Sequence, residues 1–414
     1  MSLSVELSGL QVAQTDLDTI GNNIANVSTP GFKDSTPNFT DVYATSLAGA
    51  AGASQGLGAA ANSLSQLFTE GTIAQTGNPL DVAIDGSGFF QVQTGTGIAY
   101  SRDGSMQLNA GGFLTNQTGA LIMGYAAPAS GSTATASGPL QTIQINQSNI
   151  APTATSNLSM DLNLPSSDPL INTTTTPFSV TNANSYNQST TSTIFDSLGG
   201  SHTLTTFFTQ VSGSGSPPDW QTHWEVSNSN GTMVASGTGA KLVFSTSGAL
   251  TAGSGTINVS GLANGADPLA ITQTFTGTTL SSLPFGVNSL GNNGAPGGQF
   301  SGLQIGSNGN VIAQYTNGAT KIMGTIALAN FVNPQGLAAT TNNNWLSTVA
   351  SGNPVTNAPG TGILGTLQSG ALEGSNVDLS TQLVDLIVAQ QAYQANVQGI
   401  NVDQQDVQKL LTLQ

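Results

Sequence analysis

The two ends of the chain share one spacing of apolar residues, a 4-3 alternation that restricts each end to a long helix. The N-terminal series is Leu3, Leu7, Leu10, Gln14, Leu17, Gly21 and Ile24. The C-terminal series is Leu379, Leu383, Leu386, Gln390, Tyr393, Val397, Ile400, Gln404, Val407 and Leu411. An apolar residue about every 3.5 positions forms a narrow seam, which another helix covers better than a broad core does. We therefore predict that both helices pack with neighbouring copies of the chain, and that the two helices of one chain also pair.

The predicted helices are long. At about 1.5 Å per residue they would extend roughly 36 Å and roughly 50 Å. The first is expected to end at Ser28, because Thr29 precedes Pro30 and a residue before proline disfavours helix. The second is expected to begin near Ser375, since Ser375 and Asp378 have the spacing of a capping box.

Three glutamines, Gln14, Gln390 and Gln404, interrupt the apolar seams. They either specify the register of helix packing, as buried polar residues do in some coiled coils, or they face solvent or a central channel. Both interpretations stay open on the sequence alone.

Charge is scarce in this chain and mostly acidic. Of 414 residues only 6% are charged, with 20 acids against 5 Lys and Arg and a formal net charge of −15. So few cations cannot neutralise a row of phosphates, and we expect neither nucleic acid nor a membrane surface as a partner. The absence of cysteine excludes disulfides and thiolate chemistry. No secretory-signal pattern is recognisable, because the first cation is Lys33 and no apolar block precedes it.

From about residue 78 the apolar period changes to two, which predicts strands. Asp-Gly and Asn-Gly pairs between such runs favour tight hairpins. We expect hairpins at Asp85-Gly86, Asp103-Gly104, Asn308-Gly309 and Asn317-Gly318. The two blocks that contain these turns, 78–145 and 299–360, are expected to form one discontinuous inner β-domain.

The segment between these blocks, 146–298, is predicted to be an inserted outer β-domain, either a barrel or a sandwich. Alternation is clear in two runs, the first through His202, Leu204, Thr206 and Phe208, the second through Trp220, Thr222, Trp224 and Val226. The predicted fold class is therefore multidomain α+β, with a coiled-coil-like core of terminal helices and two mainly-β domains, the outer inserted into the inner.

The remaining segments complete the predicted domain map. Residues 1–28 and 375–414 form the helical polymerisation domain, and 29–77 with 361–374 form a connector. Because 45–65 is mostly Ala, Gly and Ser, we expect a flexible or loosely packed segment there, with weak helical character around 57–67.

Several strings carry a resemblance to a known family. NNIANVSTPGFK (22–33) resembles the N-terminal signature of bacterial flagellar rod and hook proteins. The signature residues here are Asn22, Asn23, Ile24, Ala25, Asn26, Pro30, Gly31, Phe32 and Lys33. TEGTIAQTGNPLDVAIDGSGFF (69–90), SRDGSMQLNAGGFL (101–114), IALANFVNPQGL (326–337) and the C-terminal stretch from 365 follow in the family's order. Within that family, TIFDSLGGSHTLTTFF (193–208) and the size of the insertion are similar to hook proteins.

The resemblance implies a structural subunit that self-assembles into a flexible tube and transmits motor torque to the filament as a universal joint. It also implies a place in the flagellar hook outside the cell, reached through the flagellar export apparatus without a cleaved signal. The implied partners are further copies of the chain, the distal rod, the hook cap and the hook–filament junction proteins.

Catalytic and cofactor chemistry is not expected. His202 and His223 lie in predicted strands near Asp219 and Glu225, and we interpret them as strand-surface residues rather than metal ligands, since a third aligned ligand is missing. Two alternatives to a hook subunit stay open. One is a distal rod or hook-junction component, and the other is an exported β-rich adhesin or polysaccharide-active enzyme.

Overall fold

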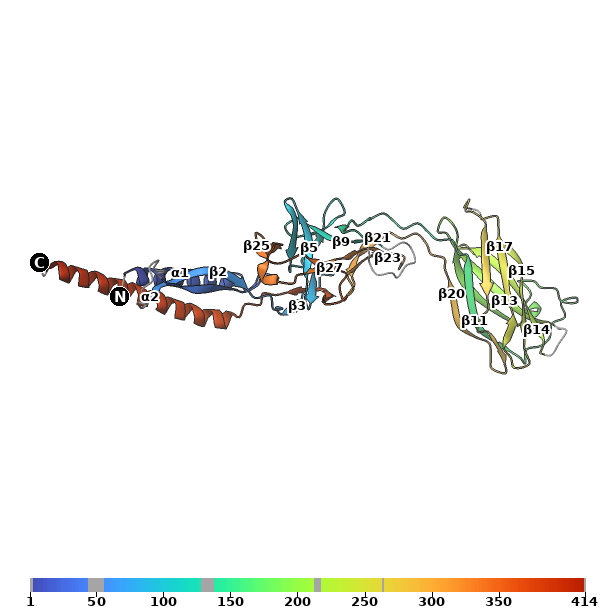
Figure 1. The fold of residues 1–414 in the computed structure, drawn as a ribbon. Helices are drawn as coiled ribbons and strands as arrows, with labels where there is room; N and C mark the ends of the chain where they lie inside the picture. The colour runs from blue at the N-terminus through green and yellow to red at the C-terminus, as the bar shows by residue number, and fades with distance from the viewer. Residues whose placement is uncertain (1–2, 44–55, 128–137, 212–216, 263, 413–414) are drawn as a thin grey trace. The chain divides into compact units, whose positions relative to one another are not determined.

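A computed structural model describes residues 3–43, 56–127, 138–211, 217–262 and 264–412 (Figure 1). The chain divides into two compact units. Unit 1 comprises Met1–Gln147, Gly302–Gln314 and Thr320–Gln414, and unit 2 comprises Ser148–Ser301 and Tyr315–Ala319. The predicted combination of terminal helices and a mostly β middle is confirmed.

Helix α1 spans Leu3–Ala25 and helix α2 spans Leu379–Thr412. α1 therefore ends three residues before the predicted Ser28, in a turn where the Thr29 amide donates to the Asn26 carbonyl. α2 begins after Asp378, whose carboxylate accepts hydrogen bonds from the amides of Ser380 and Thr381 at 2.8 and 3.2 Å. Asp378 is thus the N-cap, and the expected start at Ser375 was wrong.

The segment predicted as a loose connector instead contains a two-stranded hairpin. Strand β1 (Ser35–Tyr43) pairs antiparallel with β2 (Gly56–Gln66), so neither flexible chain nor helix describes 56–66. The rest of that prediction, 45–55, lies outside the described residues. Small side chains let β2 lie directly on α1, where the Ala59 amide donates to Ser8 Oγ and a Cβ on Gly58 would collide with the same hydroxyl. The composition that suggested flexibility instead permits this close approach.

Strands from two distant parts of the chain join in the main sheet of unit 1. β9 pairs with β23, β5 with β24, and β6 with β26. The early strands are β3 (Ile73–Gln75), β4 (Val82–Asp85), β5 (Phe89–Thr94), β6 (Gly97–Ser101), β7 (Met106–Leu108), β8 (Leu114–Asn116), β9 (Leu121–Ala126) and β10 (Gln141–Thr142). The late strands are β21 (Phe300–Ile305), β22 (Asn310–Tyr315), β23 (Thr320–Ile326), β24 (Leu328–Asn330), β25 (Ala338–Thr340), β26 (Asn344–Leu346), β27 (Val355–Asn357), β28 (Thr366–Ser369) and β29 (Ala371–Glu373), with a 3-10 turn at Pro334–Gly336.

Two of the four predicted hairpins form. Gly309 and Gly318 have positive φ in the turns that join β21 to β22 and β22 to β23. Asp85-Gly86 and Asp103-Gly104 are not hairpin turns, because β4 pairs with β28, β6 with β5, and β7 with β8. At Gly104 the chain instead runs against β4, where its carbonyl accepts from the Val82 amide and an added Cβ would collide with the Val82 carbonyl.

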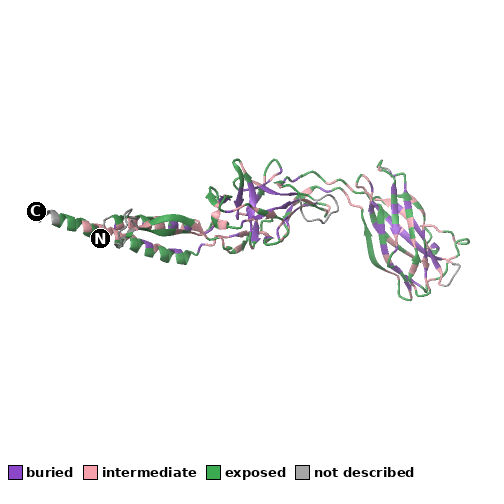
Figure 2. Cartoon of the chain, viewed as in Figure 1, coloured by how far each residue is buried: buried purple, intermediate pink, exposed green. Residues whose placement is uncertain are grey.

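Unit 2 consists of two sheets that share one hydrophobic core, as a sandwich does. One sheet contains β11, β17, β18, β19 and β20, and the other contains β12 to β16. Their bounds are β11 Asn157–Pro165, β12 Gln188–Phe195, β13 Ser201–Val211, β14 Asp219–Asn228, β15 Met233–Phe244, β16 Leu250–Ala252, β17 Ser254–Val259, β18 Leu269–Thr274, β19 Thr279–Ser281 and β20 Gly286–Asn292, with a 3-10 turn at Ala183–Ser185. Leu162, Phe208, Trp220 and Ile271 from both sheets are fully buried. Figure 2 shows buried residues in the strands of both sheets.

Both histidines lie in this unit, and both are buried, so the prediction that they lie at the strand surface was wrong. His202 Nε2 lies 2.8 Å from Asp196 Oδ2, beside the turn that Asp196 organises by accepting from the Leu198 and Gly200 amides. The ring of His223 stacks on Phe178 with centroids 4.1 Å apart. The alternation of apolar residues predicted a strand around each histidine, but it could not show which residues would bury the histidine side chain.

Acidification is expected to destabilise unit 2 through His223. Burial holds the pKa of this histidine below its ordinary value of 6.5. The folded unit therefore binds the proton more weakly than the unfolded chain does, and folding stability is lost as the pH falls through about 6.5. We expect amides of β13 and β14, corrected for intrinsic exchange rates, to exchange faster at about pH 5.5 than at about pH 7.5. His223→Phe, which keeps a ring beside Phe178, should reduce that difference, and an undiminished difference would contradict the assignment.

Candidate functional site

α1 and α2 lie side by side in antiparallel orientation (Figure 1), and at both ends of their contact small and polar residues face each other. Asn23 Nδ2 donates to Gln382 Oε1 at 3.3 Å near one end of the contact. Near the other end, a Cβ added to Gly9 would lie 2.8 Å from Asn396 Oδ1, and one added to Gly399 would lie 2.8 Å from Glu6 Oε1. The backbones therefore approach closely, with no large apolar side chain between them at these points.

The residues of the predicted seams lie beside this contact or away from it. Leu10, Leu17, Ile24, Leu386, Tyr393, Val397 and Ile400 are partly buried. Leu7, Gln14, Leu379, Leu383, Gln390, Gln404 and Val407 are exposed, while the side chains of Leu3 and Leu411 lie outside the described residues. Figure 2 shows α2 as largely exposed along its length. A single chain thus leaves much of its apolar seam uncovered, and packing of that seam against other copies stays a prediction.

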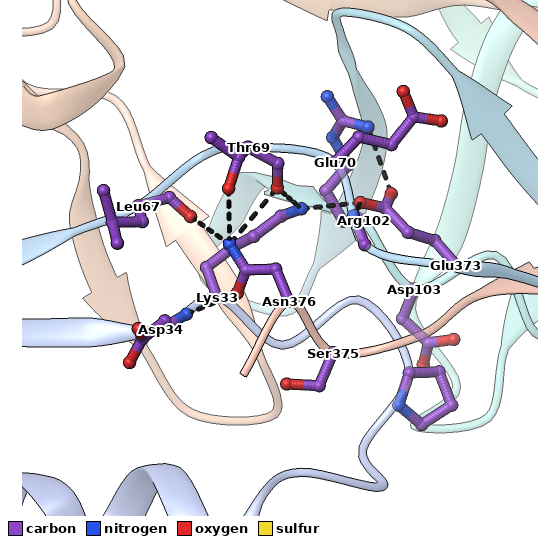
Figure 3. A network of polar contacts seen from close by, with 12 residues as sticks. Lys33, Asp34, Leu67, Thr69, Glu70, Arg102, Asp103, Glu373, Ser375 and Asn376 are labelled. Atoms are coloured by element: carbon purple, nitrogen blue, oxygen red, sulfur yellow. Dashed lines mark hydrogen bonds and ion pairs between the residues drawn. The ribbon is translucent and has the colours of Figure 1, made fainter. Parts of the chain in front are cut away.

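A buried ionic cluster fastens the chain where the helices meet the β-domain (Figure 3). Lys33 Nζ lies 2.6 Å from Glu373 Oε1, and Arg102 Nη1 lies 3.0 Å from Glu373 Oε2. Lys33 comes from the N-terminal signature, Arg102 follows β6, and Glu373 ends β29 just before α2. One carboxylate therefore joins three segments that are far apart in the sequence.

Both cations of this cluster also donate to backbone carbonyls, whereas Arg102 Nε is buried without a hydrogen-bond partner. Lys33 Nζ donates to the Thr69 carbonyl at 2.7 Å, and Arg102 Nη2 donates to the Gly86 carbonyl at 3.0 Å. Burial lowers the pKa of Lys33, while the charge of Glu373 and its hydrogen bond act in the opposite direction. The guanidinium of Arg102 also lies 5.3 Å from the centre of the Phe89 ring, which belongs to an aromatic cluster. The cluster is thus tied both to the backbone and to the core of unit 1.

Asn376, next to the cluster, ties the start of α2 to the segments around it. Its side chain accepts from the Asp34 amide at 2.7 Å and donates to the Leu67 carbonyl at 2.8 Å. Asn23 exchanges two hydrogen bonds with the backbone of Ser35, at 2.8 and 3.1 Å. The side-chain amides of Asn23 and Asn376 therefore hydrogen-bond backbone groups in the way that a neighbouring strand would.

The other signature residues shape the turn after α1. Asn26 Nδ2 donates to the Asn22 carbonyl at 2.9 Å, and the Pro30 carbonyl accepts from Asn343 Nδ2 at 3.0 Å. Gly31 has φ of +67° and donates its amide to the Glu373 carbonyl, in a space where a Cβ would contact the backbone of Arg102. Phe32 lines a cavity of about 640 Å³, Ile24 is partly buried, and Ala25 is exposed.

Sequence reasoning missed Arg102, Glu373 and Asn376. The sequence did contain a signal for an ionic cluster. The chain has only 5 Lys and Arg, and a cation such as Lys33, in a signature next to buried segments, needs an acidic partner when it is buried. Periodicity alone could not identify that partner, since Glu373 lies 340 residues from Lys33.

Comparison with known proteins assigns the family. Models described as Flagella basal body rod protein, Flagellar hook protein FlgE/F/G D1 domain, Flagellar basal body protein FlaE D2 domain and Flagellar basal body rod FlgEFG protein C-terminal match residues 3–33, 83–162, 163–295 and 368–413. The Flagellar hook protein FlgE of Escherichia coli K12 is 38% identical, with 100% of both chains covered. The chain belongs to the flagellar hook protein family.

Further relatives agree with this assignment. The Flagellar hook protein FlgE of Salmonella typhimurium is 37% identical over 100% of both chains, and that of Borreliella burgdorferi is 30% identical over 100% of this chain and 99% of the relative. The solved structure of Helicobacter pylori flagellar hook protein FlgE2 has a TM-score of 0.57 with 13% identity, and it covers 72% of this chain and 100% of that one. This structural likeness supports the fold. The resemblance inferred from the signature strings is confirmed.

Replacement of Glu373 is expected to destabilise unit 1 strongly. In Glu373→Gln two cations stay buried without an ionised partner, a change that typically costs about 3–5 kcal/mol. Glu70→Gln is the matched control, because Glu70 is exposed and makes one hydrogen bond to the Gly86 amide, so its loss should cost less than about 1 kcal/mol. Equilibrium urea unfolding, with amide exchange of β5 to locate the effect, measures both. Equal unfolding free energies for the two variants would contradict the role assigned to the cluster.

Proposed function

We propose that this hook-family protein is the structural subunit of the bacterial flagellar hook, a tube that transmits motor torque to the filament and bends as a universal joint. The observation that carries the proposal is full-length similarity to hook proteins together with an α2 whose apolar residues stay exposed in the single chain. The terminal helices form the polymerisation core, and other copies cover what one chain leaves open.

The exposed apolar residues of α2 are numerous enough to require a partner. They are Leu379, Leu383, Val384, Ile387, Val388, Val402 and Val407, with Val388 still 59% exposed. A soluble chain rarely presents a contiguous apolar surface of this kind unless a partner covers it. Full burial of such a side chain contributes roughly 1.5–3 kcal/mol, and assembly can supply about half of this for each of these partly exposed residues. The contact between α1 and α2 in the single chain leaves these side chains between 43% and 61% exposed.

The domain organisation follows from the same proposal. The helical polymerisation domain is 1–28 and 375–414, joined by segments 29–77 and 361–374 to a discontinuous inner β-domain, 78–145 and 299–360, with the outer β-domain 146–298 inserted into it. The strand pairs between early and late chain in unit 1 support the discontinuous domain, and the shared core of two sheets in unit 2 supports the insertion. The β1–β2 hairpin stiffens the connector.

The partners and location of the subunit are part of the proposal. It assembles with itself and meets distal rod, hook cap and hook–filament junction proteins outside the cell, after flagellar export without a cleaved signal. None of the helices in the described part of the chain is long and apolar enough to cross a membrane. The proposed role is mechanical and not enzymatic.

Tube formation tests this function. Because the chain carries a net charge of −15, raising the salt concentration should promote polymerisation by screening repulsion between copies. Electron microscopy of the purified chain at high salt should then show curved or supercoiled tubes. Straight, short tubes would favour a rod protein, and the absence of any polymer, or faster assembly at low salt, would contradict the proposal.

Leu383→Ser is expected to weaken polymerisation without unfolding the subunit. Leu383 is 46% exposed in the single chain, so assembly can bury about half of its side chain, which contributes about 0.7–1.5 kcal/mol. Loss of this contribution corresponds to a rise of about 3- to 12-fold in the critical concentration for assembly. Leu198→Ser, which removes a leucine that is 62% exposed in unit 2, is the matched control and should assemble normally. Sedimentation of polymer at increasing protein concentration measures the critical concentration of each variant. Equal values for the two variants would contradict packing of the apolar seam between copies.

A further inference from the structure

Five asparagines of this chain precede a glycine, which is the sequence in which the next backbone nitrogen attacks an asparagine side chain most easily. They are Asn230, Asn264, Asn293, Asn308 and Asn317. Glycine has no side chain to shield its backbone nitrogen, so all five pairs begin with the same local chemistry. How the fold holds each asparagine is what distinguishes them.

The backbone does not separate four of the five sites. Gly231, Gly265, Gly309 and Gly318 have φ between +77° and +81°. Each of their amides donates to the carbonyl three positions earlier, at 2.9 to 3.3 Å. In each of these turns the attacking nitrogen must therefore give up one similar hydrogen bond before it can react.

Two of the asparagines are held at both ends of the side-chain amide or by a charged group. Asn317 Nδ2 donates to the Pro296 carbonyl at 2.7 Å, and its Oδ1 accepts from the Ala319 amide at 3.0 Å. Asn264 Nδ2 donates to the carboxylate of Asp196. Attack on either side chain requires these bonds to break first.

Two others are held through their side-chain oxygen. Asn293 Oδ1 accepts from the amides of Ser156 and Asn157 at 3.0 and 2.9 Å. Asn308 Oδ1 accepts from the Asn310 amide at 3.2 Å, and the glycine that follows Asn308 is buried. These contacts fix the direction of the side chain, as asparagine often does in turns.

Asn230 differs from the other four. It is exposed at the tip of the β14–β15 hairpin, and its side chain hydrogen-bonds none of the residues that the structure describes. Asn228 organises this turn instead, because its Oδ1 accepts from the amides of Asn230 and Thr232 at 3.1 and 2.9 Å. A Cβ added to Gly231 would meet nothing within 4 Å, so water reaches the site.

We propose that Asn230-Gly231 is a site of spontaneous deamidation in the folded chain, favoured over the other four pairs. The Gly231 nitrogen, after losing its proton to hydroxide, bonds to Asn230 Cγ, and the side-chain nitrogen takes up a proton and leaves as ammonia. Water then opens the resulting succinimide at either carbonyl, which leaves an aspartate or an isoaspartate.

The product changes the surface of unit 2. No charged residue lies between Glu225 and Lys241 in the sequence, so the reaction places a negative charge on a hairpin tip that is synthesised neutral. Isoaspartate also adds a carbon to the main chain, within the turn that Asn228 organises. A subunit therefore acquires a new charge at this tip as it ages.

Ageing of the purified full chain in mildly alkaline buffer tests this inference. Peptide mapping after pepsin digestion at acid pH, where little further deamidation occurs, measures the modified fraction at each of the five asparagines over time. Each side-chain hydrogen bond that must break first slows attack by about 2- to 12-fold. Asn230 should therefore be modified fastest, ahead of Asn308 by about that factor and ahead of Asn264, Asn293 and Asn317 by more.

The same chain in concentrated guanidinium chloride is the control, because unfolding removes these hydrogen bonds and the five rates should become similar. Asn230→Gln, whose longer side chain forms the cyclic imide far more slowly, should remove the fastest modification and leave the other four rates unchanged. If Asn230 of the folded chain is modified no faster than the other four, or if its lead persists after unfolding, the inference is overturned. The measurement uses free subunits, so either outcome leaves the proposed hook function untouched.

Discussion

The carboxylate of Glu373 is the point on which the arrangement of unit 1 depends. It lies between Lys33 and Arg102, and all three side chains are buried, so none of the three charges is tolerable without the others. Two of the chain's 5 Lys and Arg are used here. The cluster therefore holds three segments together: the signature after α1, the loop after β6 and strand β29 before α2. Both terminal helices therefore leave the β-domain from a single rigid origin.

Beyond that point, one face of each helix contacts the other helix, while the residues on other faces stay exposed. The face that α1 turns to α2 carries Gly9 and Asn23, and the facing positions of α2 include Gln382 and Gly399. Small residues at these points let the backbones approach closely. The larger residues, such as Leu383 and Val388, stay exposed. If the two helices of one chain packed these large residues against each other, the pair would be more stable alone. It would then present less apolar surface to neighbouring copies.

The sequence predicted the elements with short-range signals and missed what depends on distant partners. Heptad spacing located both helices, and alternation located β13 and β14, because periodicity is local. The Ala-, Gly- and Ser-rich segment was wrongly expected to be loosely packed with weak helical character, because its strand depends on pairing with β1 and contact with Ser8. Glu373 went unnoticed and the burial of His223 was misjudged, since each depends on a residue that the fold brings from elsewhere.

The two kinds of charge near the base of α2 have opposite mechanical effects. Glu373 is compensated and fixes where the helix begins. Twelve positions later the contact of α2 with α1 holds like charges, because burial raises the pKa of Asp16 and the charge of Asp385 raises it further. The start of the helix is thus held by compensated charges, whereas its contact with α1 includes charges that repel each other. A subunit of a bending tube benefits from this combination, because neighbouring copies can adjust the direction of α2 without disturbing the β-domain from which it emerges.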